Sequence, residues 1–292
     1  MALSTQERQK LQDIARELRL TVIDVMAWSG GAHVGGSLSI IDILTILYFK
    51  YLDVHPADPQ WDERDRFVLS KGHAAAGLIP VLAKRGFFPE ETLKTFNHFG
   101  SPFAMHPDSN KVIGCDASAG SLGHGLSMAV GMALGARQRK MPWKTVCLMG
   151  DGECCEGSIW EAAMSAPHFK LGNLIGIVDR NRFMIDGETE DVMPLEPFAD
   201  KWRAFGWEVV EVDDGRCLGK VGGEADDLFV VLAQFGQRAA VDLAGGHGRR
   251  IVGVPVGSGH DCHIIPPSGS KPWRGRTTPN RRTHSGRRRC FP

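Results

Sequence analysis

The chain has 292 residues, enough for one large α/β domain with an extension and more than one small core needs. Hydrophobic residues make up 42% and charged residues 23%, as in an ordinary soluble globular protein, and no unbroken apolar run approaches the 18 residues of a membrane span. The N-terminal stretch is charged and amphipathic and lacks the features of a secretory signal, so we expect a cytoplasmic protein.

The net charge of zero hides an asymmetry along the chain. From residue 246 onward there are ten Lys and Arg against one acid, Asp261, which leaves a net charge of about −9 on the first 245 residues. We therefore expect an α/β domain over residues 1–215, an uncertain continuation over 216–245, and an atypical basic Gly/Pro/Arg-rich tail over 246–292 without stable structure. A change of reading frame is one hypothesis for the tail. Nucleic-acid binding is the less favoured one, because Trp273 is the only aromatic stacking residue interleaved among its basic residues.

Seven scattered cysteines predict reduced thiols, because they form no CxxC pair and show no metal-ligand spacing. Cys154 and Cys155 are adjacent and could form a redox pair, but neighbouring side chains diverge, so a packing role is favoured.

The first quarter of the chain predicts helices and one short strand. Residues 7–26 place apolar side chains at helical spacing, and residues 39–51 are apolar nearly all round, which predicts a docking helix followed by a buried helix. Residues 67–69 predict a short strand. The helix after it should end at Gly86, and Pro89 should begin another.

The middle of the chain alternates between strand and helix patterns. Residues 146–149 and 174–178 predict buried strands, residues 158–169 the helix between them, and residues 197–205 a helix before the strand 208–212. Residues 228–233 fit a strand or a helix. This alternation predicts an α/β fold with a mostly parallel sheet and helices on both faces.

Two of these strands end in polar residues, at GDG (150–152) and at DRN (179–181). Neighbouring parallel strands end at the same edge of a sheet, so Asp151 and Asn181 should lie close together. One carboxylate and one amide oxygen suit a magnesium ion that phosphate groups also hold, and ligands of α/β sheets bind at this edge. The alternative is that both residues belong to ordinary turns; two strand patterns about thirty residues apart make that reading weaker.

Several motifs now support a resemblance to a known family. GDG followed by a downstream Asn resembles the thiamine-diphosphate fingerprint, and HVGGSLSIIDIL, WDERDRFVLSKGHAA, AGSLGHGLSMAVGMAL and LGNLIGIVDRN extend the match over about two hundred residues. The chain resembles the N-terminal, thiamine-diphosphate-binding half of transketolase, most of all the separate subunit found where the enzyme is split over two chains. The resemblance implies the thiamine-diphosphate-binding fold, its diphosphate-binding domain.

The resemblance also implies a role for individual residues. Magnesium would be bound by Asp151, Asn181 and the backbone carbonyl of Phe183. His73 would contact the diphosphate, and His33 and His106 would line the substrate channel. Glu156 would lie near the subunit contact and support the activating glutamate of the cofactor. The residues expected to pack against the cofactor are Gly120, Ser121, Leu122, Gly150 and Gly152. One departure is Arg182, which stands where relatives often have Gly.

The implied activity is transfer of a two-carbon ketol unit between sugar phosphates, as in the pentose phosphate pathway. Nothing after residue 213 resembles the pyrimidine-binding domain, so activity would need a C-terminal partner subunit, in a heterotetramer with two copies of each chain. Alternatives are an α-type chain of a 2-oxo acid dehydrogenase, the front of a deoxyxylulose-phosphate synthase, or a non-catalytic remnant of the family.

Overall fold

Three buried segments form one side of a five-stranded sheet. The computed structural model describes residues 3–185, 187–212 and 227–232. In this part of the chain β1, β2 and β3 run parallel, with Phe67 opposite Val146 and Val146 opposite Ile175. The strands are β1 (Arg66–Leu69), β2 (Thr145–Gly150), β3 (Leu174–Arg180), β4 (Phe183–Met184), β5 (Gly187–Glu188), β6 (Glu208–Val212) and β7 (Asp227–Leu232).

The strand order is β1-β2-β3-β7-β6. β7 lies between β3 and β6 and is antiparallel to both, so the segment that fitted either a strand or a helix is a strand. β4 and β5 form a separate two-stranded ribbon just beyond β3. The predicted α/β fold is confirmed, with its parallel strands grouped in the first half of the sheet.

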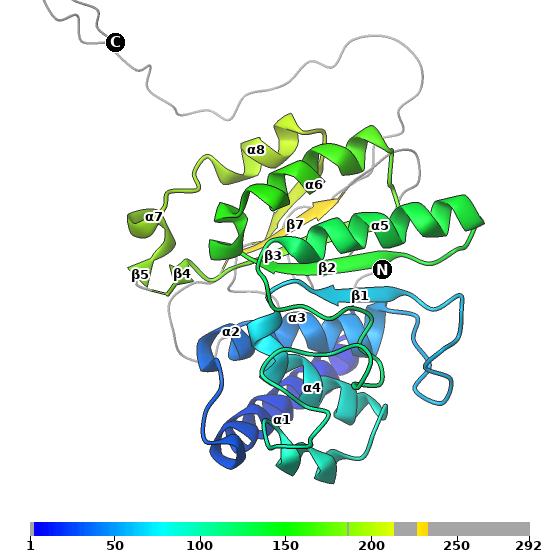
Figure 1. Cartoon of the computed structure of the whole chain (residues 1–292), viewed down its shortest axis with the longest axis vertical. Coiled ribbons are helices and arrows are strands. Elements are labelled where there is room, and N and C mark those ends of the chain that lie inside the picture. Colours follow the sequence, from blue (N-terminus) through cyan, green and yellow to red (C-terminus); the bar gives the residue numbers. More distant parts are fainter. Residues whose placement is uncertain (1–2, 186, 213–226, 233–292) are drawn as a thin grey trace, which may run out of the picture. The chain divides into compact units, whose positions relative to one another are not determined.

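Helices cover the two faces of the sheet (Figure 1). The longer helices are α1 (Thr5–Ser29), α4 (Ala75–Arg85), α5 (His124–Arg139), α6 (Gly157–His168) and α8 (Phe198–Ala204), and the shorter ones are α2 (Val34–Leu38), α3 (Ile41–Ile46), η1 (Leu47–Tyr51), η2 (Gly72–Ala74), η3 (Glu90–Thr95), η4 (Gly152–Cys155) and α7 (Thr189–Val192). α1, α3 and α4 lie on one face, and α5, α6 and α8 on the other (Figure 1).

Alternate residues of β1, β2 and β3 enter two different cores. In β2, Val146 and Leu148 pack with α1, α3 and α4, whereas Cys147 and Met149 pack with α5 and α6. Successive side chains of a strand point to opposite faces, so a strand covered on both faces must be apolar at every position. That is why residues 146–149 of β2 and 174–178 of β3 are continuous apolar runs in the sequence.

α1 is defined by its caps and by one apolar stripe. The Ser4 hydroxyl accepts a hydrogen bond from the Glu7 N–H, and the Glu7 carboxylate accepts one from the Ser4 N–H, which together form a capping box. Gly30 ends the helix with φ 71°, a conformation that favours glycine. The predicted docking face is confirmed by its buried residues, which are Leu11, Ala15, Leu18, Val22 and Val25.

The predicted helix over residues 39–51 is divided into α3 and the π-helical turn η1, with α2 before them. The window Val34–Tyr51 is the one described segment apolar and long enough by composition to cross a membrane, with mean hydropathy 1.3. Half of it is buried inside the protein, and Ile40, Ile41 and Leu44 belong to the core. The core helix of a soluble protein passes the same test, so this window is weak evidence for a membrane span.

Cys115, Cys147, Cys154 and Cys155 are free thiols, as expected. Cys154 is buried and Cys155 is exposed, so the two do not act as a pair in this structure. The described residues all belong to one compact unit, 1–252. The expected continuation over 216–245 falls mostly outside the described residues, and the basic tail over 246–292 falls wholly outside them.

Candidate functional site

The carboxyl ends of β1, β2 and β3 form the candidate site. Gly150, the last residue of β2, pairs with Asp179 of β3, and the Asp151 N–H donates to the Asp179 carbonyl at 3.2 Å. The segments after β2 and β3 are therefore adjacent, as the parallel pattern predicted. The turn after β1 reaches the same edge, because the Ser70 N–H donates to the Leu148 carbonyl at 2.8 Å.

Asp151 is a buried carboxylate that organises this edge. Its Oδ2 accepts hydrogen bonds from the Arg182 N–H and the Thr189 hydroxyl, both at 2.9 Å, and its Oδ1 accepts one from the Gly152 N–H. Burial raises the pKa of Asp151, while the bonds from Thr189 and Gly152 oppose this shift. The carboxylate thus ties the turn after β2 to the segment 182–189.

Asn181 and Arg182 form the corresponding turn after β3. The Asn181 Oδ1 accepts a hydrogen bond from the Phe183 N–H at 3.0 Å, and its Nδ2 donates to Asp179 at 3.3 Å. Arg182 has φ 61°, in the left-handed region that favours glycine. This conformation gives a physical reason for the Gly that the family resemblance leads us to expect at this position.

A buried ion pair joins the ends of β1 and β3. The Lys71 ammonium lies 2.6 Å from the Asp179 carboxylate, and the two side chains are 1% and 3% exposed. Ser39, at the end of α2, donates to the same carboxylate oxygen at 2.7 Å. Burying two charges is costly unless they are paired and hydrogen-bonded, and this pair meets both conditions. Lys71 and Asp179 therefore place a fixed ion pair without net charge at the edge of the sheet.

Glu153 is a second buried carboxylate at this edge. It accepts hydrogen bonds from the Ser70 hydroxyl and from the N–H groups of Gly123 and Gly150, the last two at 2.8 and 3.1 Å. Burial raises its pKa, and these bonds oppose the rise. Glu153 therefore joins the turn after β1, the turn after β2 and the loop before α5 into one unit.

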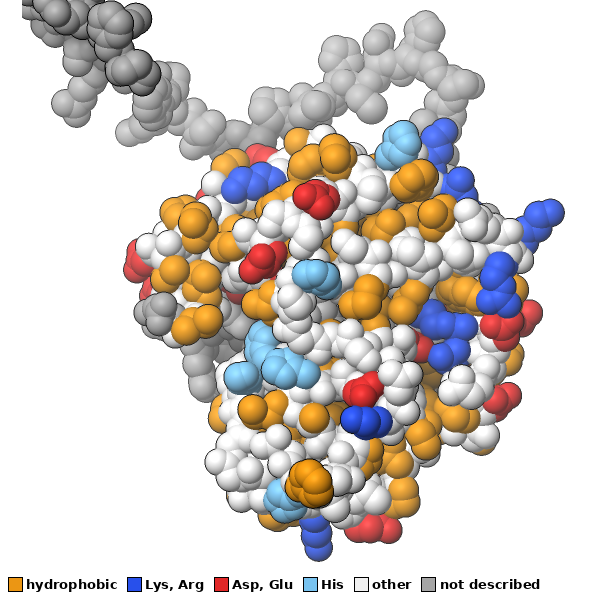
Figure 2. Space-filling model, in the orientation of Figure 1, with side chains coloured by type: hydrophobic (Ala, Val, Ile, Leu, Met, Phe, Trp, Pro, Cys, Tyr) orange, Lys and Arg blue, Asp and Glu red, His pale blue; other side chains and the backbone are white. Residues whose placement is uncertain are grey.

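The structure brings the three predicted histidines together. The His33 ring lies 5.2 Å from the His73 ring and 6.4 Å from the His106 ring, centroid to centroid. Burial, and then the positive charge of Lys71, lowers the pKa of His73 to about 4, so its imidazole is neutral near pH 7. Figure 2 shows histidine side chains gathered at the surface beside α2.

The loop expected to pack against a cofactor lies beside these histidines. A Cβ atom on Gly72 would come within 2.6 Å of the Ala119 backbone, and one on Gly120 would lie 3.6 Å from the His106 ring. Glycine at position 72 therefore permits close contact between the turn after β1 and the loop. Ser121 is exposed and Leu122 is half-buried.

Glu156 lies at the start of α6, on the exposed side of the site. It is the N-cap residue of that helix and is exposed. A Cβ atom on Gly123, which has φ 82°, would lie 2.7 Å from the Glu156 Cβ. Glu156 is thus adjacent to the cofactor loop and accessible to another chain.

The described residues contain no group of three or more His, Cys, Asp or Glu side chains that could hold a metal ion alone. An ion shared with phosphate groups needs fewer protein ligands. The side-chain Oδ1 atoms of Asp151 and Asn181 each accept a backbone hydrogen bond, and each oxygen has a second lone pair. The oxygen-only donor set therefore fits magnesium.

A family model described as "Transketolase, thiamine diphosphate binding domain" matches residues 10–222, nearly three quarters of the chain. The chain belongs to the transketolase family. Its domain is the thiamine-diphosphate-binding one, as the family resemblance of its motifs implied.

Individual relatives agree with this family. The chain is 45% identical over 209 residues to 6-deoxy-6-sulfo-D-fructose transketolase subunit SqwG of Clostridium sp. (strain MSTE9), covering 72% of this chain and 76% of that one. It is 47% identical over 223 residues to an apulose-4-phosphate transketolase subunit of Phocaeicola vulgatus, covering 76% of this chain and 75% of that one.

Full-length transketolases are matched over a smaller share of their length. A crystal structure of transketolase from Pichia stipitis superposes with a TM-score of 0.65 at 34% identity, covering 68% of this chain and 31% of that chain. The human transketolase sequence is 38% identical over 213 residues, covering 71% of this chain and 33% of that one. This transketolase-family chain therefore spans about a third of the single-chain enzymes.

The sequence pattern did not single out four residues of this transketolase-type site. Lys71 and Asp179 were not predicted because their pairing joins positions 108 residues apart. Ser39 was not predicted because it lies at a helix end that is far from Asp179 in the sequence. Glu153 was not predicted as a separate site residue because it lies two residues after Asp151. The one local signal was charge within apolar surroundings: Asp179 is an acid inside a fully buried strand.

Proposed function

We propose that this chain is the N-terminal, thiamine-diphosphate-binding subunit of a two-subunit transketolase. The observation that carries the proposal is the match to transketolase subunits at 45 and 47% identity over about three quarters of their length. The chain covers only 33% of single-chain transketolases. The proposed reaction transfers a two-carbon ketol unit between sugar phosphates, in carbohydrate metabolism such as the pentose phosphate pathway.

In this proposal Asp151, Asn181 and the carbonyl of Phe183 bind a magnesium ion that also holds the cofactor diphosphate. The bonds from Arg182 and Thr189 fix the orientation of the Asp151 carboxylate. Pre-oriented oxygen ligands need no rearrangement when the ion binds.

The glycine turns and the loop before α5 would hold the cofactor itself. Gly150 and Gly152 flank Asp151 without side chains that would obstruct a diphosphate, and Gly120, Ser121 and Leu122 would pack on the rings. The buried pair of Lys71 and Asp179 would hold the turns after β1 and β3 in place beside the cofactor. When bound, thiamine diphosphate supplies the carbanion-stabilising chemistry that no side chain can.

The three histidines would handle the sugar substrate. His73 would contact the diphosphate, while His33 and His106 would donate hydrogen bonds to hydroxyl and carbonyl oxygens of the sugar. The low pKa of His73 keeps its ring neutral, so it can both donate and accept a hydrogen bond at pH 7.

The partner would be a C-terminal subunit with the pyrimidine-binding domain. Glu156 is exposed beside the cofactor loop, and this exposure supports a contact with a glutamate of such a partner. We propose a heterotetramer of two copies of each chain, located in the cytoplasm.

Co-expression with a candidate partner followed by a ketol-transfer assay tests this function. Activity is expected only with both chains, thiamine diphosphate and a divalent ion. Asp151→Asn should lower kcat/KM by about 100-fold or more, about 2.7 kcal/mol, because the ion loses its only charged protein ligand. Asp191→Asn on exposed α7 is the matched control and should leave the rate unchanged. Full activity of the single chain, or equal rates for both variants, would contradict the proposal.

A further inference from the structure

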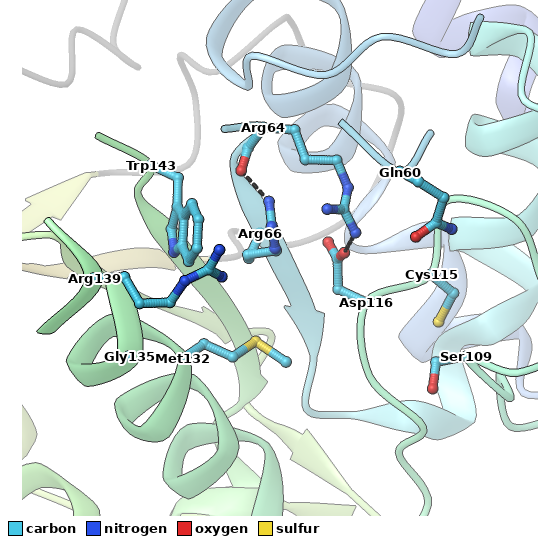
Figure 3. Close-up of a pocket in the computed structure, with 10 residues that line it drawn as sticks. All are labelled: Gln60, Arg64, Arg66, Ser109, Cys115, Asp116, Met132, Gly135, Arg139 and Trp143. Carbon is cyan, nitrogen blue, oxygen red and sulfur yellow. Dashed lines mark hydrogen bonds and ion pairs between the residues drawn. The ribbon is translucent and has the colours of Figure 1, made fainter. Parts of the chain in front are cut away.

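A cavity of about 420 Å³ lies at the opposite end of the parallel strands from the candidate site. Arg66, the first residue of β1, and Trp143, two residues before β2, line one part of it, and Arg139, the last residue of α5, lies beside them (Figure 3). Ligand sites of small molecules commonly have volumes of about 300–1,000 Å³. The cavity is therefore large enough for a small metabolite.

Arg66 supplies positive charge that carboxylates neutralise only in part. Its guanidinium lies over the Trp143 ring, 4.3 Å from the centroid, and donates to the backbone carbonyls of Arg64 and Asp62. Its ion pair with the Asp62 carboxylate is long, 3.9 Å, beyond hydrogen-bonding distance. Burial and the nearby charge of Arg64 lower the pKa of Arg66, so a bound anion would relieve an unfavourable environment.

The other two arginines of the cavity are already paired, but their pairing leaves an excess of positive charge. Arg64 lies 2.6 Å from Asp116, and Arg139 lies 2.6 Å from the exposed Asp62. Three arginines and Asp116 line the cavity, and Asp62 pairs with Arg139 beside it, which leaves one positive charge in excess. Guanidinium groups bind phosphate through two parallel N–H bonds. Arg139 is held by its exposed pair with Asp62 and by a contact with the Trp143 ring, 5.4 Å from the centroid, and an anion can displace the exposed pair.

The rest of the cavity provides neutral polar groups and apolar wall. Figure 3 shows Gln60, Cys115 and Ser109 on the side away from Trp143, with Arg64 and Asp116 between. A phosphate beside Arg66 and Arg139 would leave room for a hydroxylated body near Gln60 and Ser109.

We propose that this cavity binds a small phosphate monoester of about the size of a sugar phosphate. Such binding would be separate from the carboxyl-end site and does not depend on ketol transfer. The ligand needs one phosphate group that binds the arginines and hydroxyl groups that bind the neutral side chains of Gln60 and Ser109.

The α5 helix offers a matched pair of variants for the test. Gly135 lines the cavity and Gly131 lies one turn earlier on the same helix, and a Cβ atom on either meets nothing within 4 Å. Gly135→Glu would place a carboxylate four residues before Arg139, where it pairs with that arginine and neutralises the cavity. Gly131→Glu is the matched control. Neither substitution removes a contact, and both replace a helical glycine with a better helix former.

The experiment is isothermal titration calorimetry of the full chain with ribose 5-phosphate, inorganic phosphate and ribose at low salt. Wild type should bind ribose 5-phosphate more tightly than phosphate and should not bind ribose. Gly135→Glu should weaken binding of ribose 5-phosphate at least about tenfold, Gly135→Gln less, and Gly131→Glu less than about twofold. Absence of binding by wild type at about 20 mM, or equal affinities of Gly135→Glu and Gly131→Glu, would overturn the proposal.

Discussion

The two ends of the parallel strands both concentrate charge, but they hold it differently. At the carboxyl end, Lys71 and Asp179 are almost completely buried and paired at 2.6 Å. At the amino end, Arg139 and Asp62 pair at the same distance, yet their side chains are 56% and 59% exposed. The two ion pairs therefore have very different interaction energies at the same distance. Water screens the exposed pair and is excluded from the buried one.

This difference fits the roles proposed for the two ends. A buried, fully bonded network is rigid, so it can hold Asp151 and the glycine turns in one geometry for a tightly bound cofactor. An exposed ion pair exchanges partners at little cost, which suits a site that an anion enters and leaves.

Removing one member of each ion pair should give the largest contrast. Lys71→Met leaves the Asp179 carboxylate buried without its counter-charge and should lower the free energy of unfolding by about 3–5 kcal/mol. Arg139→Gln should change it by less than about 1 kcal/mol. Urea denaturation measures both. Adding Asp179→Asn to Lys71→Met should recover part of the loss, and similar effects of Lys71→Met and Arg139→Gln would remove the contrast.

Glu153 should show that the carboxyl-end network depends on satisfied hydrogen bonds. Glu153→Ala leaves three donors, from Ser70, Gly123 and Gly150, without their acceptor and should cost about 2–4 kcal/mol of stability. Glu156→Ala, three residues later and exposed, is the control and should cost less than about 0.5 kcal/mol. Chemical denaturation of both variants would test this, and a small effect at Glu153 would mean that water replaces the lost acceptor.

Two glycines of α5 should respond oppositely to the same substitution. A Cβ on Gly125 would come within 2.6 Å of the Ser70 backbone at the carboxyl end, so Gly125→Ala should destabilise by about 1–3 kcal/mol. Gly135 faces open space in the amino-end cavity, so Gly135→Ala should stabilise by about 0.5–1 kcal/mol. Thermal unfolding should show melting temperatures that move in opposite directions; a shift of the same sign would refute the packing difference.

His73 should titrate far below an ordinary histidine. Its pKa of about 4 in the folded chain, against 6.5 for the unfolded reference, means that the unfolded state binds more protons between these values. Stability should therefore fall as pH decreases from 6.5 to 4, by about 1–2 kcal/mol after allowance for partial exposure, with no such loss above pH 6.5.

The titration is measurable by NMR, with the His73 signal assigned by its loss in His73→Gln. That variant should also show a smaller fall in stability over the same pH range. Asp151 and Glu153 titrate in the wild-type protein and in His73→Gln alike. The difference in stability between these two proteins therefore reports on His73 alone. A midpoint near 6.5 for this histidine would show that water reaches the ring freely.

Much of the site was predictable because its parts are repeated local patterns. Asp151 and Asn181 each follow a strand, and the right-handed crossover brings parallel strand ends together, so their shared edge followed from the sequence. His33, His73 and His106 were identified through a family resemblance, and their ring contacts confirm that they lie together. The lone histidines had no local pattern that required this grouping.

The sequence by itself determined most of the strands and helices, because the spacing of apolar residues, the caps and the glycines act over a few residues, but it left residues 228–233 open between a strand and a helix. It also determined the family, through motifs that extend over most of the chain. Only the tertiary structure decided that Lys71 pairs with Asp179, that Glu153 joins three turns, and that three arginines share one cavity. These features depend on burial and on contacts between distant segments, and neither the depth of a side chain nor its long-range partner is encoded in local spacing.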